Sequence, residues 1–186
     1  MQDASVVVVP GLGGSSASHW QSIWQAQHPA WVRSAPASWD EPDFDDWDRA
    51  IGTAVQAAGG PVVLVAHSLG CLSAVAFAAH SPERVRGVFL VAPPDPDAPS
   101  FPTAVLRFGA ATASLELPPV PTVAVTSTTD PYCSADRSAD ICRRWGALQI
   151  DIGGAGHINV LSGHGPWPEG LDLLRRFLGD LEGGHR

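Results

Sequence analysis

The sequence predicts an α/β protein built on a doubly wound, mostly parallel sheet. Short apolar runs alternate along the chain with segments in which apolar residues recur every three or four positions. The first pattern is typical of strands buried on both faces, and the second is typical of amphipathic helices. Because a parallel neighbour requires a crossover, repeated strand–helix units predict helices on both faces of the sheet.

The strands are expected where β-branched residues dominate, as in SVVVV and VVLVA. They are predicted over residues 5–9, 31–35, 62–66, 85–92, 122–127 and 148–152. The clearest helix contains Phe44, Trp47, Ile51 and Val55, which are spaced three or four apart, and a Gly-Gly-Pro sequence ends it. The helices are predicted over residues 18–27, 43–58, 69–79, 103–111, 134–145 and 169–181.

The composition is that of one globular domain covering residues 1–186. Hydrophobic residues make up 45% of the chain and charged residues 16%, so the chain is long and apolar enough to bury a core. The formal net charge is −8, and no stretch approaches the ~18 apolar residues of a membrane span. We therefore expect neither nucleic acid nor a membrane as a partner.

The N-terminus and the cysteines predict a cytoplasmic protein. The first residues, MQDASVVVVPG, lack the basic segment and the long apolar run of a signal peptide. The three cysteines, Cys71, Cys133 and Cys142, are odd in number and lack metal-ligand spacing. We expect them to be free thiols in a reducing compartment.

Three residues that suit nucleophilic catalysis follow predicted strands. Ser68 comes after VVLVA, Asp130 after TVAVTSTT, and His157 after the last strand, in GGAGHIN. Active sites of doubly wound sheets lie beyond the carboxyl ends of the strands, and Ser, Asp, His is the chain order of α/β-hydrolases. We predict that Ser68 is the nucleophile, His157 the base and Asp130 the acid that orients the base.

The turn at the serine departs from Gly-x-Ser-x-Gly, because Ala66 stands at its first position. A methyl group is the smallest possible intrusion, so we still expect a tight strand-to-helix turn. Such a turn directs the amide of Leu69 toward a developing oxyanion. The loop PGLGGSS after the first strand lacks the Lys-Ser/Thr of a phosphate-binding loop, and we expect Leu12 to supply the second oxyanion amide.

Other residues are alternatives for the acid and the base. Asp95 follows the strand at 85–92, where some hydrolases place their acid, whereas Asp136 and Asp151 fall within a predicted helix and a predicted strand. His164 also lies in a loop. His67 is the immediate neighbour of the serine, and adjacent side chains diverge, so we expect it to pack beneath the turn.

The substrate pocket is predicted from aromatic residues and from the proline-rich stretch 93–121. This stretch is too short for a lid with its own core, so we expect a flap that places Phe101, Leu106 and Phe108 against the acyl group. Trp20 and Trp167 lie near the oxyanion loop and the base in sequence, and are candidates for the pocket wall. Aromatic residues at helical spacing also suit a hydrophobic core, which is the alternative for Trp20.

Five segments between Pro10 and Gly170 carry a resemblance to a known family. They read PGLGGSSASHWQSIW, DFDDW, VVLVAHSLGC, DPYCS and GAGHINVLSGHGPWPEG. Together they resemble the small serine-hydrolase family of α/β-hydrolases typified by retinoblastoma-binding protein nine and its YdeN-like bacterial relatives. The resemblance implies a compact hydrolase core without a large lid, esterase-like or peptidase-like activity, and a triad on Ser68, Asp130 and His157.

We therefore expect a serine hydrolase, of carboxylesterase type, that acts on small ester or amide substrates through an acyl-enzyme. No metal and no organic cofactor is expected. Two alternatives stay open: a protein-binding module on a hydrolase scaffold, and an acyltransferase in which an alcohol or amine replaces water. The intact triad argues against the binding module, and nothing in the sequence indicates a protein partner.

Overall fold

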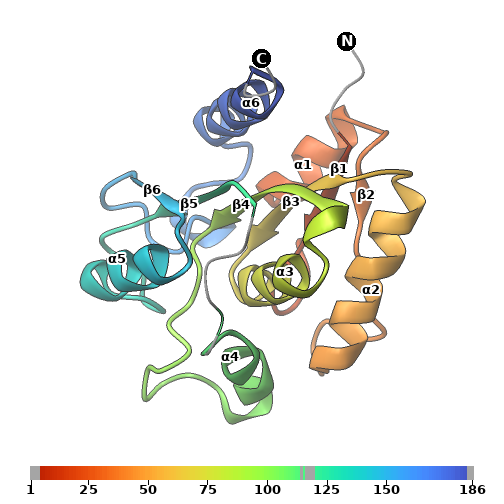
Figure 1. The fold of residues 1–186 in the computed structure, drawn as a ribbon. Coiled ribbons are helices and arrows are strands. Elements are labelled where there is room, and N and C mark those ends of the chain that lie inside the picture. Colours follow the sequence, from red (N-terminus) through yellow and green to blue (C-terminus); the bar gives the residue numbers. More distant parts are fainter. Residues whose placement is uncertain (1–4, 114, 116–119, 184–186) are drawn as a thin grey trace.

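A computed structural model describes residues 5–113, 115 and 120–183, and Figure 1 shows its fold. Within these residues six strands form one sheet in the order β2-β1-β3-β4-β5-β6, and every neighbouring pair is parallel. The predicted doubly wound, parallel sheet is confirmed. The strands are β1 (Val6–Val9), β2 (Val32–Arg33), β3 (Val62–His67), β4 (Val85–Val91), β5 (Thr122–Thr126) and β6 (Leu148–Asp151).

The helices overlap their predicted ranges, and capping side chains set several of their boundaries. Asp43 and Ser134 cap α2 and α5 by accepting hydrogen bonds from amides in the first turn. His19 caps α1 in the same way, so this helix begins later than predicted. The helices are α1 (Trp20–Gln27), α2 (Phe44–Ala57), α3 (Leu69–His80), α4 (Leu106–Ala113), α5 (Ala135–Arg144) and α6 (Pro168–Gly183), with short 3-10 turns η1 (Pro82–Arg84), η2 (Thr103–Val105) and η3 (Val160–Ser162).

The sheet separates two hydrophobic cores, because alternate strand residues point to opposite faces. Val7 and Val9 of β1 belong to the core under α2, α3 and α5, whereas Val6 and Val8 belong to the core under α1 and α6. Figure 1 shows α6 on the opposite side of the sheet from α3 and α5. Both faces of the strands are thereby buried, which explains their continuous apolar runs.

The connection from β4 to β5 contains η2 and α4, and no larger insertion is present among its described residues. Residues 114 and 116–119 of the predicted flap, 93–121, lie outside the described residues. α4 packs on α3, and the first part of the connection is tied to α5 by the ion pair of Asp95 with Arg137.

Cys71, Cys133 and Cys142 are free, as predicted, and the structure buries all three. Burial raises the pKa of each thiol, that of Cys142 to about 12, so all three are neutral near pH 7.

No helix among the described residues has the length and apolar character needed to cross a membrane.

Candidate active site

Ser68, Asp130 and His157 meet at one edge of the sheet. They follow β3, β5 and β6, and parallel strands present their carboxyl ends at the same edge. Nε2 of His157 lies 2.8 Å from Oγ of Ser68, and Nδ1 of His157 lies 3.0 and 2.9 Å from the two carboxylate oxygens of Asp130. The structure therefore places the three predicted residues in one hydrogen-bonded chain, although they are far apart in sequence.

A strained backbone presents the serine. Ser68 has φ 54° and ψ −129° at the junction of β3 and α3, and its side chain makes no capping hydrogen bond to the helix. Its amide donates to the carbonyl oxygen of Val91, which anchors the turn to β4. A positive φ in a non-glycine residue costs of order 1–3 kcal/mol and concentrates at functional sites. The strain leaves Oγ free to contact His157.

Close backbone packing around the serine requires glycine at two positions. A Cβ atom on Gly70 would lie 2.6 Å from the carbonyl oxygen of Val9 and closer still to that of Pro10. A Cβ atom on Gly11 would lie 2.9 Å from Cβ of Ser68. Ala66 is accommodated as a fully buried residue of β3. The tight turn therefore forms with alanine at the first position of the motif.

The amides of Leu12 and Leu69 suit the predicted oxyanion site. Both residues line the cavity at Ser68, and neither amide donates a hydrogen bond within the described part of the chain. In the same loop, the amide of Gly13 donates to Trp39 and that of Gly14 to Gly11. The Leu12 amide is thus available where its neighbours are occupied, and the Leu69 amide lies at the start of α3, where no intrahelical acceptor exists.

None of the alternatives to Asp130 hydrogen-bonds to His157 among the described residues. Both oxygens of Asp95 are held by Arg137, at 2.9 Å from Nε and 2.7 Å from Nη2, and this pairing lowers the pKa of Asp95. Asp136 is exposed on α5, and Asp151 is exposed on β6. Asp130 is buried, and its Oδ1 also accepts a hydrogen bond from the amide of Tyr132. Asp130 is the only one of these four carboxylates that contacts His157 among the described residues.

Neither of the two other candidate histidines hydrogen-bonds to Ser68 among the described residues. His164 lies with Nδ1 3.2 Å from Oγ of Ser162. His67 is buried, and its Nε2 donates a hydrogen bond to the carbonyl oxygen of His157 at 3.0 Å. Burial, helped by the neighbouring His157 and His19, lowers the pKa of His67 well below its usual value, so its ring is neutral. His67 therefore lies beside the base and bonds to its backbone.

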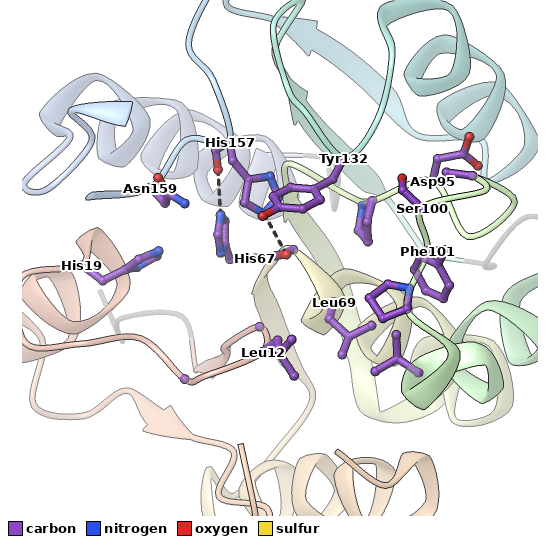
Figure 2. Close-up of a pocket in the computed structure, with 17 residues that line it drawn as sticks. Leu12, His19, His67, Leu69, Asp95, Ser100, Phe101, Tyr132, His157 and Asn159 are labelled. Atoms are coloured by element: carbon purple, nitrogen blue, oxygen red, sulfur yellow. Dashed lines mark hydrogen bonds between the residues drawn. The ribbon is translucent and has the colours of Figure 1, made fainter. Parts of the chain in front are cut away.

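A cavity of about 290 Å³ opens at Ser68. Figure 2 shows His19 and Asn159 on one side of it and Ser100 and Phe101 on the opposite side. The ring of Tyr132 lies edge-on to that of His157, with 4.5 Å between ring centres. No three His, Cys, Asp or Glu side chains in the described ranges are grouped so that they could hold a metal ion. The apolar part of the wall consists of Leu12, Leu69, Pro94, Ala98, Phe101, Pro102 and Val105.

Of the residues expected at the acyl group, Phe101 lines the cavity, whereas Leu106 is exposed at the start of α4. The structure places the other three aromatic candidates in the cores and not in the cavity wall. Trp20 is fully buried in the core under α1, and its Nε1 donates to the carbonyl oxygen of Ile158 at 2.9 Å. Trp167 stacks on Trp24 in that same core, with ring centres 5.7 Å apart. Phe108 is buried on the opposite face of the sheet, edge-on to Trp47. The free energy gained by burying an aromatic ring scales with the apolar area removed from water, which favours a packed core.

Sequence reasoning missed His19, Asn159 and Tyr132 as lining residues of the cavity. Asn159 and Tyr132 each stand two residues after a predicted catalytic residue, and His19 immediately precedes α1. Such positions are a usable signal, because loops that follow strand ends surround the site in this kind of sheet.

Comparison with known proteins shows the family to which the chain belongs. A family model described as serine hydrolase matches residues 6–176. Among solved structures, a YdeN-like hydrolase from Pectobacterium atrosepticum is 35% identical, with 95% of this chain and 91% of that chain covered and a TM-score of 0.85. No curated protein matches the chain in a sequence search.

Two more distant structures share the fold. The ydeN gene product from B. subtilis is 19% identical, with 95% of this chain and 99% of that chain covered and a TM-score of 0.78. A monoacylglycerol lipase from Paleococcus ferrophilus is 17% identical, with 95% and 93% covered and a TM-score of 0.66. With the family model matching almost the whole described chain, this protein belongs to the serine hydrolase family and has a compact α/β-hydrolase fold.

Proposed function

We propose that this protein is a carboxylesterase-type hydrolase of small esters, in which Ser68, His157 and Asp130 form the catalytic triad. The observation that carries the proposal is the continuous chain from Oγ of Ser68 through His157 to Asp130 at the mouth of the cavity. This arrangement activates a hydroxyl that is otherwise a weak nucleophile. Membership of the serine hydrolase family supports the same reaction type.

The reaction proceeds in two halves. Oγ of Ser68 attacks the ester carbonyl carbon while its proton passes to Nε2 of His157, and the carbonyl electron pair moves onto oxygen. The amides of Leu12 and Leu69 donate to that oxyanion. When the carbonyl re-forms, the bond to the alcohol oxygen breaks, and Nε2 returns the proton to it. Water then repeats these steps on the acyl-enzyme, releasing the acid and restoring Ser68.

Asp130 accepts the hydrogen bond from Nδ1–H of His157 throughout the reaction. This contact selects the tautomer in which Nε2 is free to take the serine proton, and it stabilises the imidazolium that forms. The hydrogen bond from the Tyr132 amide to Oδ1 keeps the carboxylate in place. Asp130 is therefore an orienting residue as well as a countercharge.

The cavity favours a short acyl group. Its apolar wall includes Phe101, Pro102 and Val105, all contributed by the β4–β5 connection, and Asp95 stands in the same wall. A long apolar chain would have to pass a carboxylate or leave the cavity for water. We infer that acetyl to butyryl esters are the preferred size class.

Labelling with a fluorophosphonate tests the proposal. The wild-type protein is expected to react and to carry the adduct on Ser68 by mass spectrometry, and it is expected to hydrolyse p-nitrophenyl butyrate. Ser68→Ala should abolish both signals while circular dichroism stays native. Ser73→Ala is the matched control, because Ser73 is a buried serine of α3 whose Oγ has no hydrogen-bond partner among the described residues.

The same experiment separates the alternatives. A folded wild type that neither labels nor hydrolyses would overturn the proposal in favour of a binding module. Labelling at Ser68 with product formed only after addition of an alcohol or amine would identify an acyltransferase.

A further inference from the structure

Two hydrogen-bond donors face the cavity on the side of the catalytic base. His19 and Asn159 both line the cavity, and Figure 2 shows them together on the side away from Phe101 and Asp95. Asn159 follows His157 by two residues on the same loop. The ring of His67 connects His19 to His157, with ring centres 4.8 and 4.9 Å apart.

The helix cap determines which nitrogen of His19 carries the proton. Nδ1 accepts a hydrogen bond from the amide of Gln21 at 3.2 Å, so the proton of the neutral ring is on Nε2. Burial, with smaller contributions from Arg33 and His157, lowers the pKa of His19 to about 4, so the ring is neutral near pH 7. His19 is only 7% exposed, and its Nε2 has no hydrogen-bond partner among the described residues.

Asn159 is held in the same manner. Its Oδ1 accepts a hydrogen bond from the amide of Ser162 at 3.1 Å, in the cap of η3. Its backbone N–H and C=O are also satisfied, the first by Oγ of Ser162 and the second by the amide of His164. Only the Nδ2 amide group has no partner within the described residues. Both side chains therefore use their acceptor atom in a cap and keep a donor for the cavity.

The two donors lie on the side of the cavity where the departing alcohol of an ester would lie. Nε2 of His157 must reach the leaving oxygen to protonate it, so the alcohol lies on the His157 side of Ser68. The apolar wall with Phe101 lies on the other side and suits the acyl group. No arginine lines the cavity among the described residues, and Asp95 contributes a carboxylate, so a neutral acceptor suits the donors better than an anion.

We propose that His19 and Asn159 form a subsite that binds an oxygen atom on the departing alcohol, and that the natural substrates are short-chain esters of hydroxylated or ether-bearing alcohols. The inference rests on the proposed esterase function and names the alcohol class of its substrate. His19 and Asn159 bind the leaving group here and take no part in proton transfer.

A pair of isosteric esters tests the subsite. 2-Methoxyethyl butyrate and n-butyl butyrate differ by one oxygen in place of a methylene, and that oxygen can only accept hydrogen bonds. The ratio of their kcat/KM values is compared with the ratio of their hydroxide-catalysed hydrolysis rates, which corrects for intrinsic reactivity. We expect the wild-type ratio to exceed the chemical ratio by about three- to tenfold, the worth of one neutral hydrogen bond.

Two variants remove the donors and keep the caps. His19→Asp retains an oxygen that can accept from the Gln21 amide, and Asn159→Asp retains an oxygen for the Ser162 amide, because Asp is a good capping residue. An ionised carboxylate only accepts hydrogen bonds, so neither variant keeps a donor for the cavity. Each variant should lower the ester ratio toward the chemical value. His80→Asp makes the matched substitution on an exposed histidine at the end of α3, and it should leave the ratio unchanged.

The outcomes separate this inference from the proposed function. A wild-type ratio equal to the chemical ratio overturns the subsite, even where a variant fails to fold. Unchanged ratios in both folded variants also overturn it. Failure of the folded wild type to hydrolyse p-nitrophenyl butyrate or to label with a fluorophosphonate would instead reject the esterase proposal itself.

Discussion

Nε2 of His67 donates a hydrogen bond to the carbonyl oxygen of His157 across 3.0 Å. His67 is the last residue of β3 and the immediate neighbour of the serine, whereas His157 lies on the loop after β6. The contact therefore ties the loop of the proposed base to the strand that presents the proposed nucleophile. Because both residues are buried, the bond is shielded from water.

His67→Leu is expected to lower kcat for p-nitrophenyl butyrate by roughly tenfold with little change in KM. The substitution removes the donor and leaves a buried carbonyl oxygen unpaired, which costs about 1–3 kcal/mol and allows the His157 loop to move. His67→Gln, which carries an N–H donor at similar reach, should recover part of the lost kcat. Equal kcat values for natively folded His67→Leu and His67→Gln would contradict a positioning role for this hydrogen bond.

Asp130→Asn is expected to lower kcat by about 10³- to 10⁴-fold, because the amide no longer selects the reactive tautomer of His157. Asp95→Asn is the comparison, since Asp95 lines the same cavity but pairs with Arg137. It should lower the free energy of unfolding and keep kcat within about tenfold of wild type. Both variants are compared with the wild type by steady-state kinetics and urea denaturation. A larger loss of kcat in Asp95→Asn than in Asp130→Asn would show that the acid is misassigned.

The wild-type kcat/KM should peak on acetyl to butyryl esters and fall for longer acyl chains. Each buried methylene is worth about 0.8 kcal/mol only while the cavity has room for it. Phe101→Ala enlarges the apolar wall and should move the optimum to longer chains, whereas Leu161→Ala, at a 97% exposed residue outside the cavity wall, should not. A steady rise from butyryl to dodecanoyl in the wild type, measured below the micelle threshold, would reveal a long acyl channel.

Stability should fall as the pH is lowered from about 6.5 to 4. The pKa of His19 is lowered to about 4 in the folded protein, so between these values the unfolded chain binds a proton that the folded chain does not. Its contribution is fully present above pH 6.5 and amounts to roughly 3 kcal/mol across the window. His67 acts in the same direction, because its pKa is also lowered.

Urea denaturation at pH 7, 6, 5 and 4.5 measures this loss. His19→Asn, which keeps the cap and removes the titrating group, should show a smaller decrease in the free energy of unfolding over the same range. The matched substitution His80→Asn should keep the wild-type slope. Identical slopes in the wild type and His19→Asn would contradict the lowered pKa.

Local sequence patterns were sufficient to predict most of the fold. The valine run of β1, the β-branched residues of β3 and the three-to-four spacing in α2 are each read over a few neighbouring residues, and the structure has elements at those places. Ser68, Asp130 and His157 were also accessible to sequence reasoning, because each follows a strand and parallel strands end at a common edge. Their hydrogen-bonded contact is what that rule leads one to expect.

Which side chains line the cavity was decided by the tertiary structure. Which way Trp20 points is decided by how α1 packs on the sheet and by its hydrogen bond to Ile158, far along the chain. His19 and Asn159 come together because two loops separated in sequence lie on the same side of the cavity. Periodicity specifies which residues share a face of one element. The side chains that converge from different elements are determined by long-range packing, which no short stretch of sequence encodes.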